Sequence, residues 1–140
     1  MLSAKSLIQQ ILTQVCNQGD LAAVNELIVT EDSIRTASGE EPVSRMGLRH
    51  LLATFRTAFP DLHCTVEDEI SMGDKVAAYW TMRGTHLGPF LGNRATGRPI
   101  VAQGLILARI DNGRITEERT LVDQMGILQQ LGLIPPAGIK

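Results

Sequence analysis

The chain has 140 residues, 44% of them hydrophobic and 20% charged, which is typical of a globular protein with its own core and excludes a disordered segment. Its net charge is −2 and it contains no basic run, so nucleic acid is not an expected partner. It has neither a signal-peptide pattern nor an apolar run near the ~20 residues that cross a membrane. We therefore expect a single domain over residues 1–140 that works in the cytoplasm, away from membranes.

The first 60 residues are predicted to be mainly helical. Apolar residues recur at helical spacing from Leu7 to Val15, and Gly19 is a plausible stop for this helix. A second, short helix is expected over residues 20–28, followed by a short extended piece and a polar loop over residues 30–43. A third helix is expected to begin after Ser44, which can cap it, and to close at Pro60.

From residue 62 onward the pattern alternates, which predicts strands over residues 62–72, 75–86, 100–110 and 114–122. Asp68 alternates in step with Val66 and Ile70, so it is expected on the apolar face unless a bulge turns it to water. Trp80 and Tyr79 point to opposite faces, and Trp80 is expected to form pocket wall or core. The run 100–110 is apolar on both faces, which predicts a strand buried on both sides.

The end of the chain places one carboxylate, Asp123, between the last strand and a short amphipathic helix. The last two strands flank Asn112-Gly113, a dipeptide that favours a tight hairpin turn. Inside an apolar pocket the pKa of Asp123 would rise toward neutrality, as a general acid/base requires. Asp123 is equally suited to be the N-cap of the helix. Helices followed by an antiparallel meander indicate an α+β fold with a pocket between the two layers.

Other candidate site residues lie near this strand end. Arg119 shares a strand face with Asp123, about 13 Å away along an extended strand, and could bind a substrate carbonyl or carboxylate or lie at a dimer interface. Gln103 on the neighbouring strand has similarly open roles. His86 could shuttle protons or stabilise its loop. The three His and the two Cys, Cys16 and Cys64, lack metal-ligand spacing, so we expect no metal and two buried, reduced thiols.

Several motifs taken together resemble the SnoaL-like polyketide cyclases, or ester cyclases, of the nuclear transport factor 2-like superfamily. The resemblance covers roughly residues 5–135. Its most recognisable pieces are Ala58-Phe59-Pro60-Asp61, Gly84-Thr85-His86, Phe90-Leu91-Gly92, Thr96-Gly97-Arg98, and Asp123 followed by Gln130-Leu131-Gly132. The fold that it implies is a cone-shaped α+β fold, in which N-terminal helices pack on a curved, mainly antiparallel sheet that ends in a short helix.

The resemblance also implies an activity. It is that of a cofactor-independent enzyme, dimeric or tetrameric, that closes a ring by an intramolecular aldol reaction on a hydrophobic carbonyl substrate. Asp123 matches the family's general acid/base, and Glu118, Arg119 and Val122 stand where members often have His and Trp. We accordingly predict Asp123 as the catalytic residue. The residues predicted to bind the substrate are Trp80, Gln103, Arg119, His86 and Asp68.

Two other functions fit the same fold. Relatives that hydrolyse epoxides use an Asp-Arg-Asp arrangement, for which Asp68, Arg83 or Arg119, and Asp123 are available. The second of these functions is that of a non-catalytic ligand-binding or dimerisation module, in which Asp123 only caps the helix.

Overall fold

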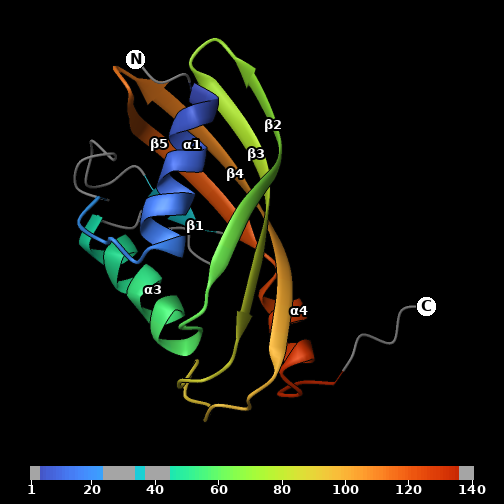
Figure 1. Cartoon of the computed structure of the whole chain (residues 1–140). Coiled ribbons are helices and arrows are strands. Elements are labelled where there is room, and N and C mark those ends of the chain that lie inside the picture. The colour runs from blue at the N-terminus through green and yellow to red at the C-terminus, as the bar shows by residue number, and fades with distance from the viewer. Residues whose placement is uncertain (1–3, 24–33, 37–44, 136–140) are drawn as a thin grey trace.

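The computed structural model describes residues 4–23, 34–36 and 45–135 (Figure 1). Helix α1 (Ala4–Ile11) continues into one wider π-helical turn, η1 (Leu12–Asn17), and the left-handed backbone of Gly19 (φ 73°) ends the helical stretch as predicted. Helix α3 (Arg45–Ala58) follows its predicted course. Most of the helix expected over residues 20–28, the proposed cap Ser44 and most of the loop over residues 30–43 lie outside the described residues.

In the described residues, five strands form one sheet in the order β1-β5-β4-β3-β2. They are β1 (Ile34–Thr36), β2 (His63–Met72), β3 (Lys75–Thr85), β4 (Pro99–Asp111) and β5 (Arg114–Val122), and helix α4 (Gln124–Gln130) follows. Only the short β1 runs parallel to its neighbour, and the other pairs are antiparallel. The α+β prediction, with a mainly antiparallel sheet and a short final helix, is confirmed.

The two tight turns form where the sequence predicts them. Gly73 between β2 and β3 has φ 60°, and Asn112 and Gly113 between β4 and β5 have φ 52° and 74°. Positive φ at both central residues is the backbone of a two-residue hairpin turn that matches the twist of its strands. The Asn112-Gly113 turn therefore fixes where pairing of the last two strands begins.

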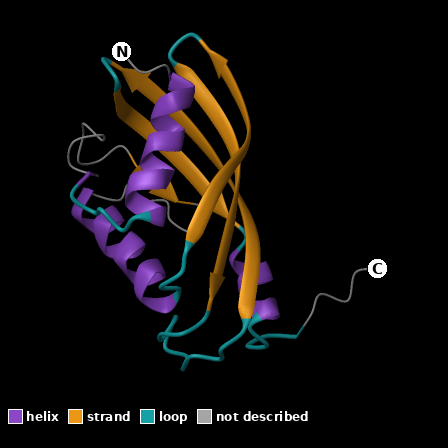
Figure 2. Ribbon diagram, viewed as in Figure 1, coloured by secondary structure: helices purple, strands orange, loops and turns teal. Residues whose placement is uncertain are grey.

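Helices cover only one face of this sheet, called the inner face here, which carries Val76, Ala78, Trp80 and Met82 of β3 (Figures 1 and 2). Leu7, Ile8 and Val15 of the first helical stretch and Leu48 of α3 pack against it. At the other end of the strands, Phe59, Ile127 and Leu131 join the core. None of the described helices has the length and apolarity needed to cross a membrane.

The opposite, outer face of the sheet is left uncovered in the described part of the chain. Its exposed apolar residues are Ile70, Met72, Tyr79, Val101, Leu105, Leu107 and Leu121. Because half of the Leu105 side chain is exposed (50%), the prediction that β4 is buried on both faces is wrong. Contiguous apolar surface of this kind commonly marks an interaction site.

A β-bulge in β2 reverses the faces that simple alternation predicts. Val66 lies opposite Trp80, but Asp68 lies opposite Tyr79, so Glu67 is an extra residue in this strand. An extra residue moves every later side chain to the other face. Of the two positions that the sequence left open for Asp68, the bulge therefore gives the one in water: Asp68 is exposed, as is Ile70.

Candidate active site

A second β-bulge, in β5, decides which carboxylate enters the interior. From the turn, Ile115 pairs with Ile110, but the next pair is Glu117 with Arg109, so Thr116 is the extra residue. Without the bulge, Glu117 and Arg119 would follow Ile115 onto the inner face. With it, Glu118 lies opposite Ala108 of the inner face instead.

Glu118 is the one carboxylate among the described residues that is buried, with 8% of its surface exposed. It shares the inner face with the core residues Ala108 and Ile115. Burial disfavours the ionised form and raises the pKa of Glu118 from its ordinary 4.5 to about 7. A carboxyl group with such a pKa can both accept and return a proton near neutral pH.

Beyond Glu118, the inner face of β5 continues with Thr120 and Val122, and both are only half-buried. Val122 lies opposite Gly104 of β4, and Gly104 lies opposite Trp80 of β3. Trp80 is on the inner face, as predicted. Successive inner residues of a strand are about 7 Å apart, so this cross-strand row lies about 13 Å from Glu118.

Asp123 is exposed and caps helix α4 instead of reaching the interior. Its Oδ1 accepts a hydrogen bond of 2.9 Å from the backbone N–H of Gly126. The side chains of Glu117, Arg119 and Leu121, on the outer side of the same strand, are exposed as well. From the sequence, Asp123 could act as a helix cap or as a general acid/base. The structure shows the capping contact, and it does not place Asp123 in an apolar interior.

Replacing Asp123 with Ala should lower the free energy of unfolding by about 1 kcal/mol, because the helix loses its N-cap. Asn is as good a cap as Asp, so Asp123→Asn is the matched control and should change stability little. Urea unfolding followed by circular dichroism measures both. Equal losses in the two variants would contradict the capping role.

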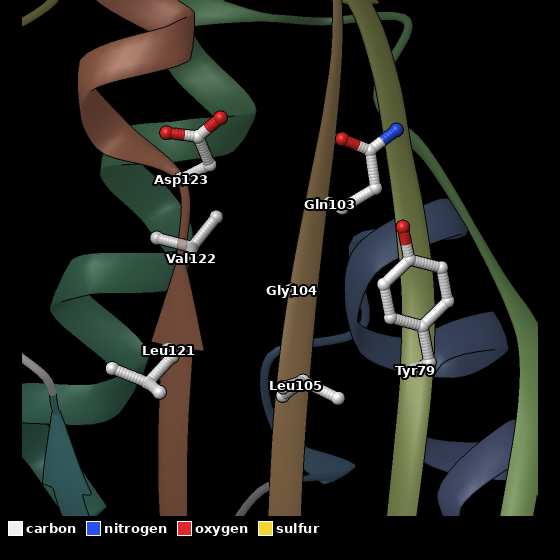
Figure 3. Close-up of a pocket in the computed structure, with 7 residues that line it drawn as sticks. All are labelled: Tyr79, Gln103, Gly104, Leu105, Leu121, Val122 and Asp123. Carbon is white, nitrogen blue, oxygen red and sulfur yellow. The ribbon is translucent and has the colours of Figure 1, made fainter.

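Asp123 does border a hollow of about 250 Å³ on the outer face (Figure 3). The other lining residues are Tyr79, Gln103, Gly104, Leu105, Leu121 and Val122. The structure thus brings two predicted site residues, Asp123 and Gln103, to one place. Trp80 is on the opposite face of the sheet and does not join them.

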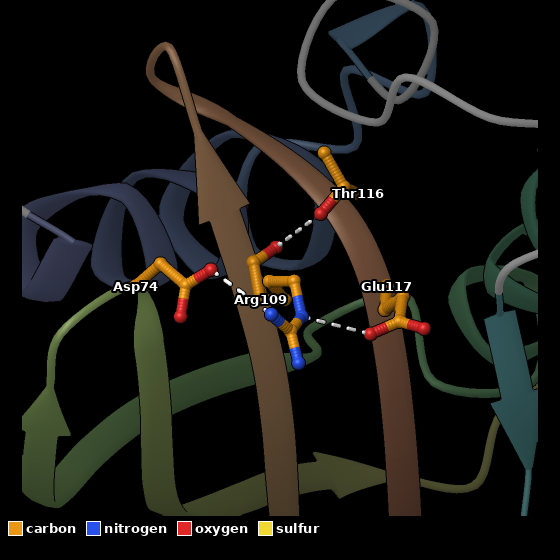
Figure 4. A network of polar contacts seen from close by, with 4 residues as sticks. All are labelled: Asp74, Arg109, Thr116 and Glu117. Atoms are coloured by element: carbon orange, nitrogen blue, oxygen red, sulfur yellow. Dashed lines mark hydrogen bonds and ion pairs between the residues drawn. The ribbon is translucent and has the colours of Figure 1, made fainter.

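Two arginine side chains of the sheet, Arg119 and Arg109, also lie outside the interior. Arg119 is exposed on the outer face, opposite Leu107. Arg109 is held by ion pairs to Asp74 (3.1 Å) and Glu117 (3.0 Å), and its carbonyl accepts a hydrogen bond from Thr116 Oγ1 (Figure 4). The network ties the β2–β3 turn to β4 and to the bulge of β5, which indicates a structural role for Arg109.

His86 is fully buried and holds the loop between β3 and β4 closed. Its Nδ1 accepts a hydrogen bond from the Thr96 backbone N–H (3.1 Å) and lies 3.0 Å from Thr96 Oγ1. The backbones of His86 and Gly97–Arg98 are also hydrogen-bonded, and the imidazole packs against Phe59 and Phe90. These contacts fit the role in stabilising the loop that the sequence left open for His86.

Cys16 and Cys64 are buried, unbridged thiols, as predicted. A hydrogen bond with Cys16, together with burial, raises the pKa of Cys64, so its thiol stays protonated at neutral pH. Over the described ranges, no three His, Cys, Asp or Glu side chains come together as metal ligands would.

Sequence reasoning missed Glu118 as a site residue because the bulge is not visible in the alternation of residues. The charges around the Asn112-Gly113 hairpin do give one signal of the bulge. Unbulged pairing from the Asn112-Gly113 turn would place Arg109 opposite Thr116, whereas a one-residue shift places it opposite Glu117, a charge partner.

These features define the class: a cone-shaped α+β domain of the nuclear transport factor 2-like type, with an ionisable carboxyl group on the helix-covered face of its sheet. The model of the SnoaL-like polyketide cyclases matches residues 6–131. The chain belongs to this family.

Solved structures agree with that assignment. IdmH from Streptomyces antibioticus, a proposed polyketide cyclase, is 33% identical, with a TM-score of 0.81 over 91% of this chain and 97% of IdmH. TsrD from Streptomyces laurentii is 25% identical (TM-score 0.80, 96% and 100% covered). AclR from Streptomyces galilaeus, a proposed hydroxylase, shares the fold at 24% identity (TM-score 0.84, 95% and 83% covered). A search of curated proteins found none that matches.

Proposed function

We propose that this SnoaL-like protein is a cofactor-independent cyclase or isomerase that performs acid/base chemistry on a hydrophobic carbonyl compound, with Glu118 as the group that moves the proton. The observation that carries the proposal is the burial of Glu118 on the inner face, with its pKa raised to about 7. Strongly perturbed carboxyl groups in apolar surroundings cluster at catalytic sites.

The proposed ring closure needs only one carboxyl group, and it consumes no second reactant. Ionised Glu118 takes a proton from the carbon next to a substrate carbonyl, which leaves an enolate and a protonated Glu118. The enolate carbon attacks a second carbonyl of the same molecule and closes the ring. The alkoxide formed there takes the proton back, so Glu118 ends the cycle ionised.

An aryl 1,5-diketone tests the proposal, because its intramolecular aldol closure gives a hydroxyketone, and loss of water from that product gives an aryl cyclohexenone that absorbs at longer wavelength. In D2O, mass spectrometry also detects deuterium entering the carbon next to the carbonyl. We expect the wild-type protein to accelerate both the exchange and the ring closure. Absence of both reactions, together with saturable binding of the diketone, would instead favour the non-catalytic binding module.

The epoxide-hydrolase alternative receives less support from the geometry. It requires two acids and an Arg around one water molecule. Asp68, Arg83, Arg119 and Asp123 are all exposed side chains of the described sheet and its edge, and no ion pair or hydrogen bond joins them. Hydrolysis of a hydrophobic epoxide at a rate that depends on Asp68 would overturn this preference.

We also propose that two copies of the chain pair through the outer face, whose exposed apolar side chains include Leu105 and Leu107. Leu105→Glu places a charge in the middle of that surface and should shift sedimentation from dimer to monomer. Leu87→Glu is the matched control, because Leu87 is 59% exposed but lies in the loop between β3 and β4, outside the strands. A monomeric wild type, or a dimer that both variants leave intact, would contradict this interface.

A further inference from the structure

Gly104 and Trp80 form a pair on the inner face whose packing leaves no room for a side chain at position 104. A Cβ atom on Gly104 would collide with Cζ2 and Cε2 of the Trp80 indole and would lie 2.8 Å from the carbonyl oxygen of Leu121. The indole therefore packs against the backbone of β4, in the space that the missing side chain leaves.

Trp80 remains accessible in this position. Its side chain is only half-buried, although it packs against both parts of the core. Within the described part of the chain, its indole N–H has no hydrogen-bond partner. A flat, half-exposed aromatic surface with a free donor at its edge suits contact with a planar ligand that carries an oxygen acceptor.

The distance between Trp80 and Glu118 determines how long a ligand must be to contact both residues. The row Trp80–Gly104–Val122 lies about 13 Å along the strand from Glu118, with the half-buried Thr120 between them. A carbonyl group held at Glu118 thus places the far end of a fused-ring system near Trp80. A single ring at Glu118 would stop short of it.

We infer that Trp80, packed against Gly104, forms the floor of the substrate site and sets the largest fused-ring aromatic ketone that the site accepts. This inference rests on the proposed function, since it places the reacting carbonyl at Glu118. Gly104 acts through Trp80: any side chain at position 104 lifts the indole off β4 and into the space that the ligand would use.

The experiment measures binding of acetophenone, acetonaphthone and acetylanthracene, which carry one, two and three rings beside the same carbonyl group. Trp80 is the only Trp of the chain, so quenching of its fluorescence reports contact at this position. For the wild type we expect saturable quenching and affinity that increases with ring number. Gly104→Ala should weaken acetylanthracene binding by about tenfold or more and change acetophenone binding by less than about threefold.

Two further variants separate this role from general damage to the fold. Gly84→Ala is the matched control, because a Cβ there would lie 2.9 Å from Cβ of Phe59 and does not meet Trp80. It should leave the dependence on ring number unchanged. The double variant Gly104→Ala/Trp80→Phe removes Cζ2, the ring atom nearest to the new Cβ, and leaves the contact with the Leu121 carbonyl oxygen. Equilibrium dialysis should therefore show that Gly104→Ala costs much less acetylanthracene affinity in the Trp80→Phe protein than in the wild type.

Three results would overturn the inference: no binding of any of the three ketones, an equal loss for all three in Gly104→Ala, or no rescue in the double variant. A different result is expected if the inference about Trp80 is right but Glu118 does not catalyse proton transfer. In that case the dependence on ring number persists in wild type and in Glu118→Gln, while neither protein exchanges the protons next to the carbonyl.

Discussion

Replacement of Glu118 by Gln should lower kcat for closure of the aryl 1,5-diketone by about 100-fold or more. Gln has nearly the same shape and stays in the same buried position, but it can neither accept nor return a proton. Positioned acid/base groups typically contribute about 100- to 10,000-fold to rate. Because Gln removes the proton transfer and not the binding surface, KM should change much less than kcat.

Asp123→Asn is the control for this result, since it changes the other carboxylate considered from the sequence. Asn keeps the N-cap of α4, and the outer-face carboxylate takes no part in the proposed reaction. We expect kcat within about threefold of the wild type. If Asp123→Asn loses the activity and Glu118→Gln retains it, then the reacting carbonyl lies at the outer hollow and the inner-face site is wrong.

Glu118 should also make the stability of the protein depend on pH. Its pKa is about 7 in the folded protein and near its ordinary 4.5 in the unfolded chain, so the folded state binds more protons between these two values. The contribution is fully present below about pH 4.5 and is lost as pH rises through about 7. A difference of about 2.5 in pKa corresponds to about 3 kcal/mol.

Urea unfolding at pH 5 and at pH 8 measures this effect, and Glu118→Gln supplies the reference because its amide does not titrate. The wild type should lose about 2.5 kcal/mol more than the variant between the two pH values, because a small part of the contribution is already lost at pH 5. Other titrating groups act equally in both proteins and cancel in the comparison. Identical pH dependence of wild type and variant would show that burial does not perturb Glu118.

Much of the fold could be predicted from the sequence because its local signals agree with the tertiary structure. The apolar stripe of the first helix, Pro60 after the third, and the Asn112-Gly113 turn each act within a few residues of their cause. The capping potential of Asp123 was visible for the same reason. The Asn112-Gly113 turn also determines that β4 and β5 pair antiparallel.

The faces of the strands could not be predicted in the same way. Bulges at Glu67 and Thr116 each insert one residue, and one residue is enough to exchange the inner and outer faces for the rest of the strand. Asp68 and Asp123 lie outside for this reason, and Glu118 lies inside. The exposed leucines of β4 misled for a different reason, because a strand with apolar side chains on an exposed face has the same sequence pattern as a strand buried on both faces.

The central claim is that the ionisable group of the interior is Glu118. Its most direct test is the titration of the Glu side-chain carboxyl carbons by 13C NMR, with the resonance of Glu118 assigned from its absence in Glu118→Gln. We predict a midpoint near pH 7, and a change in that midpoint when acetonaphthone is added. A Glu118 resonance that titrates near its ordinary 4.5 and does not respond to the ketone would contradict the claim.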